Sequence, residues 1–301
     1  MAVRKDLMGQ EQKSPVSTAN QGGSACPHTV ARATLAAVYH TFREAVHRTR
    51  TAGWRSGMAY TKTRLANLYL RLLGRLDKTP HVTCPCCGWR GFRFRTIDCG
   101  TFTVPDAECP HCRCHERHRM LHMYLDRRPP AFMQRSGGVL HFAPEPHLHP
   151  WMDRIDGLRV FGTDYDVNTI RACGRPPRFA SDMMYLALRD ASMDGIFCIH
   201  VMEHVPDDHK GLQELFRVLK PGAEAVLMVP LMMGWKESQE FGTPDPNQFG
   251  HVRGYSPLDF EHRLTMFSYE KIMPRDFLSA EEVKRYVIPD SQVIFLCRRT
   301  G

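Results

Sequence analysis

Residues 195–229 read GIFCIHVMEHVPDDHKGLQELFRVLKPGAEAVLMV. The apolar runs GIFCI (195–199) and AVLMV (225–229) are typical of strands buried on both faces of a parallel sheet. Between them, apolar residues recur at the i, i+3, i+4, i+7 spacing of a helix, at Leu212, Leu215, Phe216 and Leu219. We expect Pro221-Gly222 to end this helix. The stretch therefore predicts a strand–helix–strand crossover.

The same rhythm continues on both sides of this stretch. Apolar runs predict further strands at GVLHF (138–142), LRVFG (158–162), PRFAS (177–181) and QVIFLC (292–297). Helices are predicted for ERHRMLHMYLDRR, which Pro129 stops, and after Ser279, where Glu282 completes a capping box. Crossovers in series predict an α/β fold with a doubly wound, mostly parallel sheet. The stretch 231–256 has no period, and a loop of that length is usually functional.

Composition excludes several classes of protein. Hydrophobic residues make up 43% of the 301 residues, which is enough to bury a core and excludes wholesale disorder. No apolar run reaches the roughly 18 residues that cross a membrane. The N-terminus lacks the apolar segment of a secretory signal, so a cytoplasmic location is expected.

Charge is unevenly distributed along the chain. Residues 1–135 contain 22 Lys and Arg against 9 Asp and Glu, whereas residues 136–301 contain 18 against 23. A basic front half attracts nucleic acid, anionic lipid or a phosphorylated substrate. Solvated, Arg-rich helix faces are the simpler explanation of the same charge.

Four segments are expected. Residues 1–28 mix Gly, Ser, Gln and Pro and predict a disordered tail. Residues 29–80 carry two amphipathic helical patterns, which either pack on the rest of the protein or lie on a membrane surface. Residues 81–118 form a cysteine-rich module, and residues 119–301 form the α/β domain.

The cysteine-rich module has the spacing of a zinc ribbon. Cys84 and Cys87 form one C-x2-C pair, Cys109 and Cys112 form another, and 21 residues separate the pairs. Each pair places two thiolates on one tight turn, and two turns complete a tetrahedron around a structural Zn²⁺. The ligand set stays open, because Cys86, Cys114, His111 and His115 are alternatives. Buried free cysteines or a redox pair are the competing interpretations.

Polar residues follow the predicted strands where a doubly wound sheet binds its ligands, beyond the carboxyl ends. The first strand leads to Ala143, Pro144 and Glu145, and the second ends at Asp164 and Tyr165. An acid at the end of the second strand accepts hydrogen bonds from two ribose hydroxyls. Asp182 and Met183 follow the third strand and offer a polar edge and an apolar face to an adenine ring.

Taken in order, seven pieces of the sequence resemble one family: CPCCGWRGF, CPHCRCHERHR, VLHFAPE, FGTDYD, HVMEHVPDD, ELFRVLKPG and FGHVRGY. From about residue 137 to 298, the chain resembles the class I S-adenosylmethionine-dependent methyltransferases, with a Rossmann-like sheet. It looks closest to a bacterial subgroup that carries a CPxC zinc knuckle before the domain. One departure is the first loop, which reads Ala-Pro-Glu-Pro in place of a glycine-rich sequence.

The resemblance implies a cofactor site for S-adenosylmethionine. Asp164 would bind the ribose hydroxyls with Tyr165 beside it, and Asp182 with Met183 would bracket the adenine. Ala143, Pro144 and Glu145 would line the methionine moiety. The segment from His200 to His204 would border both cofactor and substrate.

Methyl transfer needs a base only when the nucleophile must lose a proton. The candidates are Glu203, His204 and His251, although each has an equally good structural explanation, such as helix N-terminal charge for Glu203. Arg253 and Tyr255 either grip a polar substrate or anchor the loop.

Three functions compete at this point. The first is methyl transfer to an oxygen or nitrogen of a small molecule or glycan. The second is nucleic-acid methylation, with RNA held by the basic front half. The third is a non-catalytic binding protein on a degenerate methyltransferase fold. The acceptor and the oligomeric state are not predicted.

Overall fold

The computed structural model describes residues 81–98, 103–145, 147–148, 155–172, 178–245 and 249–301, together with Met152 and the helical positions 46, 54, 58, 61–62, 65–66 and 68–70. The chain divides into two compact units, Met1–Arg64 and Leu65–Gly301, and the second contains all the elements below. The predicted tail at 1–28 and most of the segment 29–80 lie outside the described residues. In the described parts, no helix combines the length and apolar character that a membrane crossing requires.

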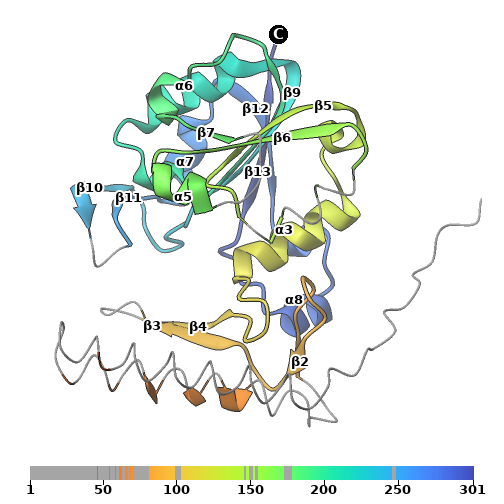
Figure 1. The fold of residues 1–301 in the computed structure, drawn as a ribbon, viewed down its shortest axis with the longest axis vertical. Helices are drawn as coiled ribbons and strands as arrows, with labels where there is room; N and C mark the ends of the chain where they lie inside the picture. The colour runs from red at the N-terminus through yellow and green to blue at the C-terminus, as the bar shows by residue number, and fades with distance from the viewer. Residues whose placement is uncertain are drawn as a thin grey trace, which may run out of the picture. The chain divides into compact units, whose positions relative to one another are not determined.

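A seven-stranded sheet forms the centre of the second unit (Figure 1). Its strands lie in the order β12-β13-β9-β8-β5-β6-β7. Their bounds are β5 Gly137–Phe142, β6 Leu158–Asp164, β7 Arg178–Ala180, β8 Met193–Ile199, β9 Leu219–Met228, β12 Phe267–Ile272 and β13 Ile294–Arg299. The five strands from β7 to β9 pair in parallel, and β13 is antiparallel to both of its neighbours. The predicted doubly wound, mostly parallel sheet is confirmed.

The order of the strands reverses between β5 and β8. From β5 the chain proceeds outward through β6 and β7, and it then returns to the other side of β5 as β8 and β9. This reversal separates the loops that leave β5 and β8, and doubly wound sheets bind their ligands at the carboxyl ends of the strands at such a point.

Helices cover both faces of the sheet. On one face, α6 (Asp208–Val218) and α7 (Pro257–Arg263) pack in a core with alternate strand residues such as Ile196 and Leu227. On the other face, α3 (Glu116–Arg127) packs in a core with the intervening residues, such as Phe197 and Val226. The central strands β5 and β8 and the second half of β9 therefore bury both of their faces, which explains their continuous apolar sequences.

Smaller elements complete the unit. They are α5 Val167–Ala172, α8 Ala280–Tyr286 and the 3₁₀ helices η1 Ala131–Gln134, η2 Met183–Tyr185, η3 Met202–His204 and η5 Pro274–Asp276. The predicted capping box is confirmed at α8, where Ser279 accepts from the amide of Glu282 and the Glu282 carboxylate accepts from the amide of Ser279.

Two sequence predictions about boundaries are wrong. Helix α6 ends at Val218, so Leu219 belongs to β9, where it pairs with Met193. Pro221-Gly222 lies inside β9 at a shift of register, and Gly222 has a φ of 75°. A proline and a left-handed glycine are accommodated there because the strand bulges.

The stretch 231–256 also differs from the predicted aperiodic loop. It contains strands β10 (Gln239–Asp245) and β11 (His251–Gly254), which form an antiparallel pair. Strand β12, which reads FSYEKI, was not predicted either. Its central side chains are exposed, as expected of a strand at the edge of a sheet.

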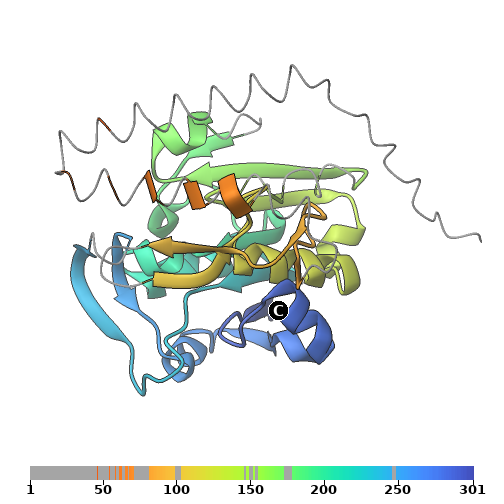
Figure 2. The ribbon, with the colours of Figure 1, turned by 90° about the horizontal axis from the view of Figure 1, so that it is seen from below.

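The cysteine-rich module consists of two small hairpins that precede α3 (Figure 2). Strands β1 (Val82–Thr83) and β2 (Arg90–Gly91) enclose the first pair of cysteines. Strands β3 (Arg95–Asp98) and β4 (Thr103–Glu108) form the second hairpin, and the second pair of cysteines follows β4.

Arg119, in the first turn of α3, joins the module to the C-terminal part of the sheet domain. Its buried guanidinium donates to the carbonyls of Ala107 (2.8 Å) and Asp106 (3.0 Å) in β4, and to those of Tyr286 (2.7 Å) and Val287 (2.8 Å) at the end of α8. The same group lies 4.1 Å from the centre of the Phe94 ring. One side chain thus satisfies four carbonyls from two distant parts of the chain.

We predict that Arg119→Met lowers the free energy of unfolding by about 3 kcal/mol or more, because each buried carbonyl left without a donor costs about 1–3 kcal/mol. Arg128→Met is the control, since Arg128 pairs with Glu270 at the exposed surface. Loss of this exposed ion pair should lower the free energy of unfolding by about 1 kcal/mol or less. Urea unfolding of both variants measures the difference. Equal small losses would contradict a clamping role for Arg119.

Candidate functional site

The loops that follow β5 and β8 each begin with a strained residue. Ala143 has a φ of 43° and His200 has a φ of 53°, both in the left-handed region that side chains with a Cβ disfavour. The amide of Ala143 still donates to the Thr163 carbonyl (2.8 Å), and that of His200 to the Met228 carbonyl (2.8 Å). Each strand therefore pairs to its last residue and then turns sharply, and such strain is typical of functional sites.

Glu145 in the first loop is held by the first turn of α3. Its Oε1 lies 2.6 Å from Nε2 of His118 and accepts from Nε of Arg117 at 3.2 Å. The amide of His115 donates to Nδ1 of His118, so Nε2 carries the proton that His118 donates to Glu145. Burial alone would raise the pKa of Glu145, but the nearby His118 and Arg117 groups hold it at about 2. Glu145 is therefore ionised at neutral pH.

Asp164 and Tyr165 lie at the end of β6. One oxygen of Asp164 accepts from the amide of Asp166 (2.7 Å), and burial raises the pKa of the carboxyl group. The Tyr165 side chain is 80% exposed. Pro144 packs against this strand because Gly162 has no side chain, since a Cβ there would lie 2.9 Å from the Pro144 ring. The loop after β5 and the end of β6 are thereby brought together.

Asp182 and Met183 lie after β7, and both already have structural contacts. Asp182 caps η2 by accepting from the amide of Met184 at 2.8 Å. Met183 is buried in the core together with Met202 and Leu212. A role at the adenine ring stays a prediction for both residues.

Glu203, in η3, is a carboxyl group buried away from solvent. Its exposed fraction is 0%, and among the residues that the structure describes neither of its oxygens has a hydrogen-bond partner. Nδ1 of His200 is 3.4 Å from Oε1. Burial raises the pKa of Glu203 to about 8, so the group is largely protonated at neutral pH. Burial also places the pKa of His200 well below its usual range.

The structure brings His251 of β11 beside Glu203 and His204, which are neighbours in η3. One ligand atom from each of the three residues lies within 4.8 Å of the others. The two imidazole rings meet edge to face with their centres 4.8 Å apart, and Nδ1 of His204 lies 3.1 Å from the Gly250 carbonyl. Burial lowers the pKa of His204, and burial together with repulsion between the two imidazoles when protonated lowers that of His251 to about 4. Both rings are therefore neutral at neutral pH.

Arg253 and Tyr255 anchor the segment that follows β8. The buried Arg253 donates to the carbonyls of Met202, Val205 and Pro206 and pairs with Glu240 at 3.0 Å. The Tyr255 hydroxyl donates to Asp208 at 2.8 Å. Of the two roles that the sequence left open for these residues, the structure shows the anchoring one.

Several buried polar atoms at the carboxyl ends of β5, β6 and β8 lack hydrogen-bond partners among the described residues. They are Oε2 of Glu145, Oγ1 of Thr163, Nε2 of His200 and both oxygens of Glu203. Leaving such atoms unpaired is costly, so a cluster of them is expected where a polar ligand binds. Thr163 and the unusual state of Glu203 were not predicted, because burial is a property of the fold.

The predicted zinc ligands lie together in the cysteine-rich module. Sγ atoms of Cys84 and Cys112 are 3.7 Å apart, and those of Cys87 and Cys109 are 3.8 Å apart. Zn–S bonds of about 2.3 Å place the sulfurs of a tetrahedral site about 3.8 Å apart, so the four thiols fit zinc. Among the described residues, neither His111 nor His115 belongs to such a group.

The two cysteine turns have the same backbone structure. In the first turn, the amide of Cys84 donates to the carbonyl five residues later, and the carbonyl of Cys84 accepts from the amide four residues later. The amide and carbonyl of Cys109 make the same two hydrogen bonds in the second turn. The fourth residue after each, Gly88 or Arg113, has a positive φ. This repetition explains why both pairs present their thiols alike.

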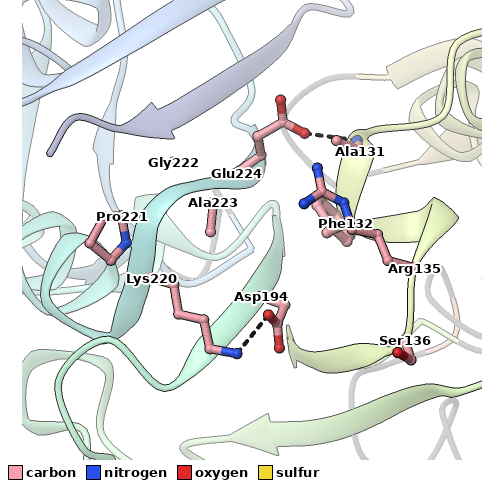
Figure 3. A pocket seen from close by; sticks show the side chains of 10 residues that line it. All are labelled: Ala131, Phe132, Arg135, Ser136, Asp194, Lys220, Pro221, Gly222, Ala223 and Glu224. Carbon is pink, nitrogen blue, oxygen red and sulfur yellow. Dashed lines mark hydrogen bonds and ion pairs between the residues drawn. The ribbon is translucent and has the colours of Figure 1, made fainter.

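One cavity of about 170 Å³ lies at the opposite end of the sheet (Figure 3). It is lined by the first residues of β9 and by Asp194 and η1, and the ion pair between Lys220 and Asp194 crosses it at 2.7 Å. Ligands of doubly wound sheets bind at the carboxyl ends of the strands, so this cavity is not the predicted cofactor site.

Comparison with known proteins gives one family match. Residues 147–227 match the family model described as "Methyltransferase domain". A Mycolicibacterium smegmatis protein, named "Probable S-adenosylmethionine-dependent methyltransferase", is 37% identical over 76 residues, which are 24% of this chain and 30% of that protein. The chain thus matches less than a third of the length of that relative.

Solved structures that resemble part of this chain include the following two. A complex of the Haloferax volcanii Trm112 methyltransferase activator and a methyltransferase contains a chain that is 17% identical, with a TM-score of 0.46 over 62% of this chain and 91% of that chain. The YcgJ protein of Bacillus subtilis is 16% identical, with a TM-score of 0.42 over 61% of this chain and 100% of that chain.

We predict that Glu203→Gln becomes more stable than the wild type as the pH rises from 4.5 to about 8. In the unfolded chain Glu203 ionises near pH 4.5, whereas in the folded protein it keeps its proton to about pH 8, so ionisation favours unfolding across this window. The gain in free energy of unfolding rises by at most about 1.4 kcal/mol per pH unit. Urea unfolding at several pH values measures it, with the exposed Glu270→Gln as control. A difference that does not change with pH would show that Glu203 is ionised in the folded protein.

Proposed function

We propose that this chain, whose residues 147–227 match a methyltransferase domain, is a class I S-adenosylmethionine-dependent methyltransferase that transfers a methyl group to an oxygen or nitrogen of a small-molecule or glycan-type substrate. The observation that carries the proposal is the cluster of buried, unpaired polar atoms at the carboxyl ends of β5, β6 and β8. S-adenosylmethionine offers an ammonium, a carboxylate and two ribose hydroxyls, which match such a cluster in chemical kind.

The proposed cofactor site uses the residues named from the sequence. Asp164 accepts from the ribose hydroxyls, for which it has one carboxylate oxygen beyond the one that Asp166 occupies. The backbone of the strained loop at Ala143, with Glu145 held by α3, supports the methionine end. The cofactor supplies an electrophilic methyl group, and the role of the protein is to align a nucleophile with it.

The proposed acceptor region lies around Glu203, His204 and His251. Below about pH 8 the carboxyl group of Glu203 holds its proton, so it can donate a hydrogen bond but is a poor base. The neutral rings of His204 and His251 can each accept a proton from a hydroxyl nucleophile. Of the three candidates, the two histidines are therefore unprotonated at neutral pH, and His204 is the better base because a pKa of about 4 makes His251 a weak one.

The proposed role of the cysteine-rich module is structural. Four thiolates close the coordination of one Zn²⁺ and leave no position for a substrate. The first turn of α3, which starts directly after the second cysteine turn, carries both the Arg119 clamp and the two residues that hold Glu145. The metal would thus support the cofactor loop without contacting it.

A nucleic-acid substrate is the second candidate. The observation in its favour is the charge of residues 1–135, where Lys and Arg exceed Asp and Glu by 22 to 9. Binding of this kind weakens steeply with salt, because phosphate contacts release counterions. Retention of RNA that disappears as salt rises would favour this candidate over a neutral small molecule.

We predict that S-adenosylmethionine binds the zinc-loaded protein with micromolar affinity and that Asp164→Ala weakens binding at least tenfold. A carboxylate that accepts hydrogen bonds contributes about 1.5–3 kcal/mol, which corresponds to a tenfold to hundredfold change in affinity. Isothermal titration calorimetry measures the affinity. Asp290→Ala is the matched control, since Asp290 pairs with Arg275 on the exposed surface.

Unchanged affinity in Asp164→Ala would remove Asp164 from the cofactor site. Failure of the wild-type protein to bind the cofactor would contradict the proposed activity and favour the non-catalytic binding protein.

A further inference from the structure

Two further cysteines lie against the four predicted zinc ligands. Sγ of Cys114 is 3.3 Å from Sγ of Cys84, and both side chains are fully buried. One sulfur from each of Cys84, Cys86 and Cys114 lies within 4.8 Å of the others, so these three form a second group that could hold a metal. The two groups share Cys84 and no other residue.

The arrangement of the shared cysteine distinguishes these thiols from ordinary buried cysteines. A lone buried cysteine packs as a small apolar side chain. Cys84 instead has two close sulfur neighbours that belong to different groups, Cys112 at 3.7 Å and Cys114 at 3.3 Å. These separations are close to the spacing of about 3.8 Å between sulfurs that bind one tetrahedral zinc.

The charge of the six thiols favours a second metal ion beside the first. One Zn²⁺ with four thiolates carries a net charge of about −2, so two more thiols beside it ionise only at a high electrostatic cost. A second Zn²⁺ that binds Cys86 and Cys114 displaces one proton from each and neutralises the two new thiolates. Six thiolates with two zinc ions therefore carry the same net charge as the simpler site.

We propose that the cysteine-rich module binds two divalent, thiolate-preferring metal ions, with the Cys84 sulfur bridging them. The coordination of the first ion is completed by Cys87, Cys109 and Cys112. The second ion is bound by Cys86 and Cys114 in addition to Cys84. Three thiolates leave one position of a tetrahedral second ion, which a water molecule occupies. The assignment shares Cys84 with the structural zinc proposed above and does not depend on methyl transfer.

The backbone is suited to this asymmetric use of two similar turns. Cys86 is the second residue after Cys84, inside the first turn, whereas Cys114 is the fifth residue after Cys109, where its carbonyl accepts from the Cys109 amide. The two extra thiols thus lie near the Cys84 sulfur although they come from different positions of their turns. Cys86 also lies 3.7 Å from the His118 carbonyl, which places the second group beside the first turn of α3.

Native mass spectrometry of the full chain, reduced and saturated with Zn²⁺, tests the proposal by counting metal ions. We expect two ions in the wild type and one in both Cys86→Ser and Cys114→Ser. Cys198→Ala is the matched control, because Cys198 lies in β8 outside the module, and it should keep two ions. Circular dichroism of each variant checks that the fold is retained.

Each other count has a definite meaning. One ion in the saturated wild type would overturn the second site and leave the single zinc in place. No ion would overturn both metal proposals. Two ions that persist in Cys86→Ser and Cys114→Ser would place the second ion elsewhere. If the serine variants fail to fold, the wild-type count and the thiolate–metal absorption of the cobalt-loaded protein still decide between one and two sites.

Discussion

The hydrogen bond between His118 and Glu145 is the contact through which the cysteine-rich module and the candidate cofactor loop depend on each other. It is short, at 2.6 Å, and it neutralises much of the cost of burying the Glu145 carboxylate, with Arg117 at 3.2 Å from the same oxygen. His118 and Arg117 lie in the first turn of α3, whose position Arg119 fixes by four hydrogen bonds. A change in the cysteine turns would therefore reach the loop after β5 through one turn of helix.

The loop after β8 is held by a separate set of contacts. Arg253 and Tyr255 bind the carbonyls and the acid of the segment 202–208, and β11 carries His251 to the same place. Two strained loops are thus fixed by different elements, one by α3 and one by β11 and the residue that follows it. Such preorganisation keeps Glu203 buried and protonated beside two neutral imidazoles.

The sheet could be predicted from the sequence because its central strands are buried on both faces and are apolar throughout. That Cys84, Cys87, Cys109 and Cys112 lie together could be predicted because their spacing is that of a zinc ribbon. The end of α6 could not be predicted, because Leu219 is a buried apolar residue that fits a helix or a strand equally well. Strand β12 was missed because its exposed residues are polar. The role of Arg119 and the pKa of Glu203 depend on neighbours more than fifty residues away or on burial, which local patterns do not contain.

The location of the cofactor site is the central claim, and hydrogen–deuterium exchange with and without S-adenosylmethionine tests it most directly. Binding at the carboxyl ends of the strands should slow exchange in residues 143–145, 164–166 and 200–204. Protection confined to residues 131–136 and 220–224, around the cavity at the opposite end of the sheet, would contradict the account.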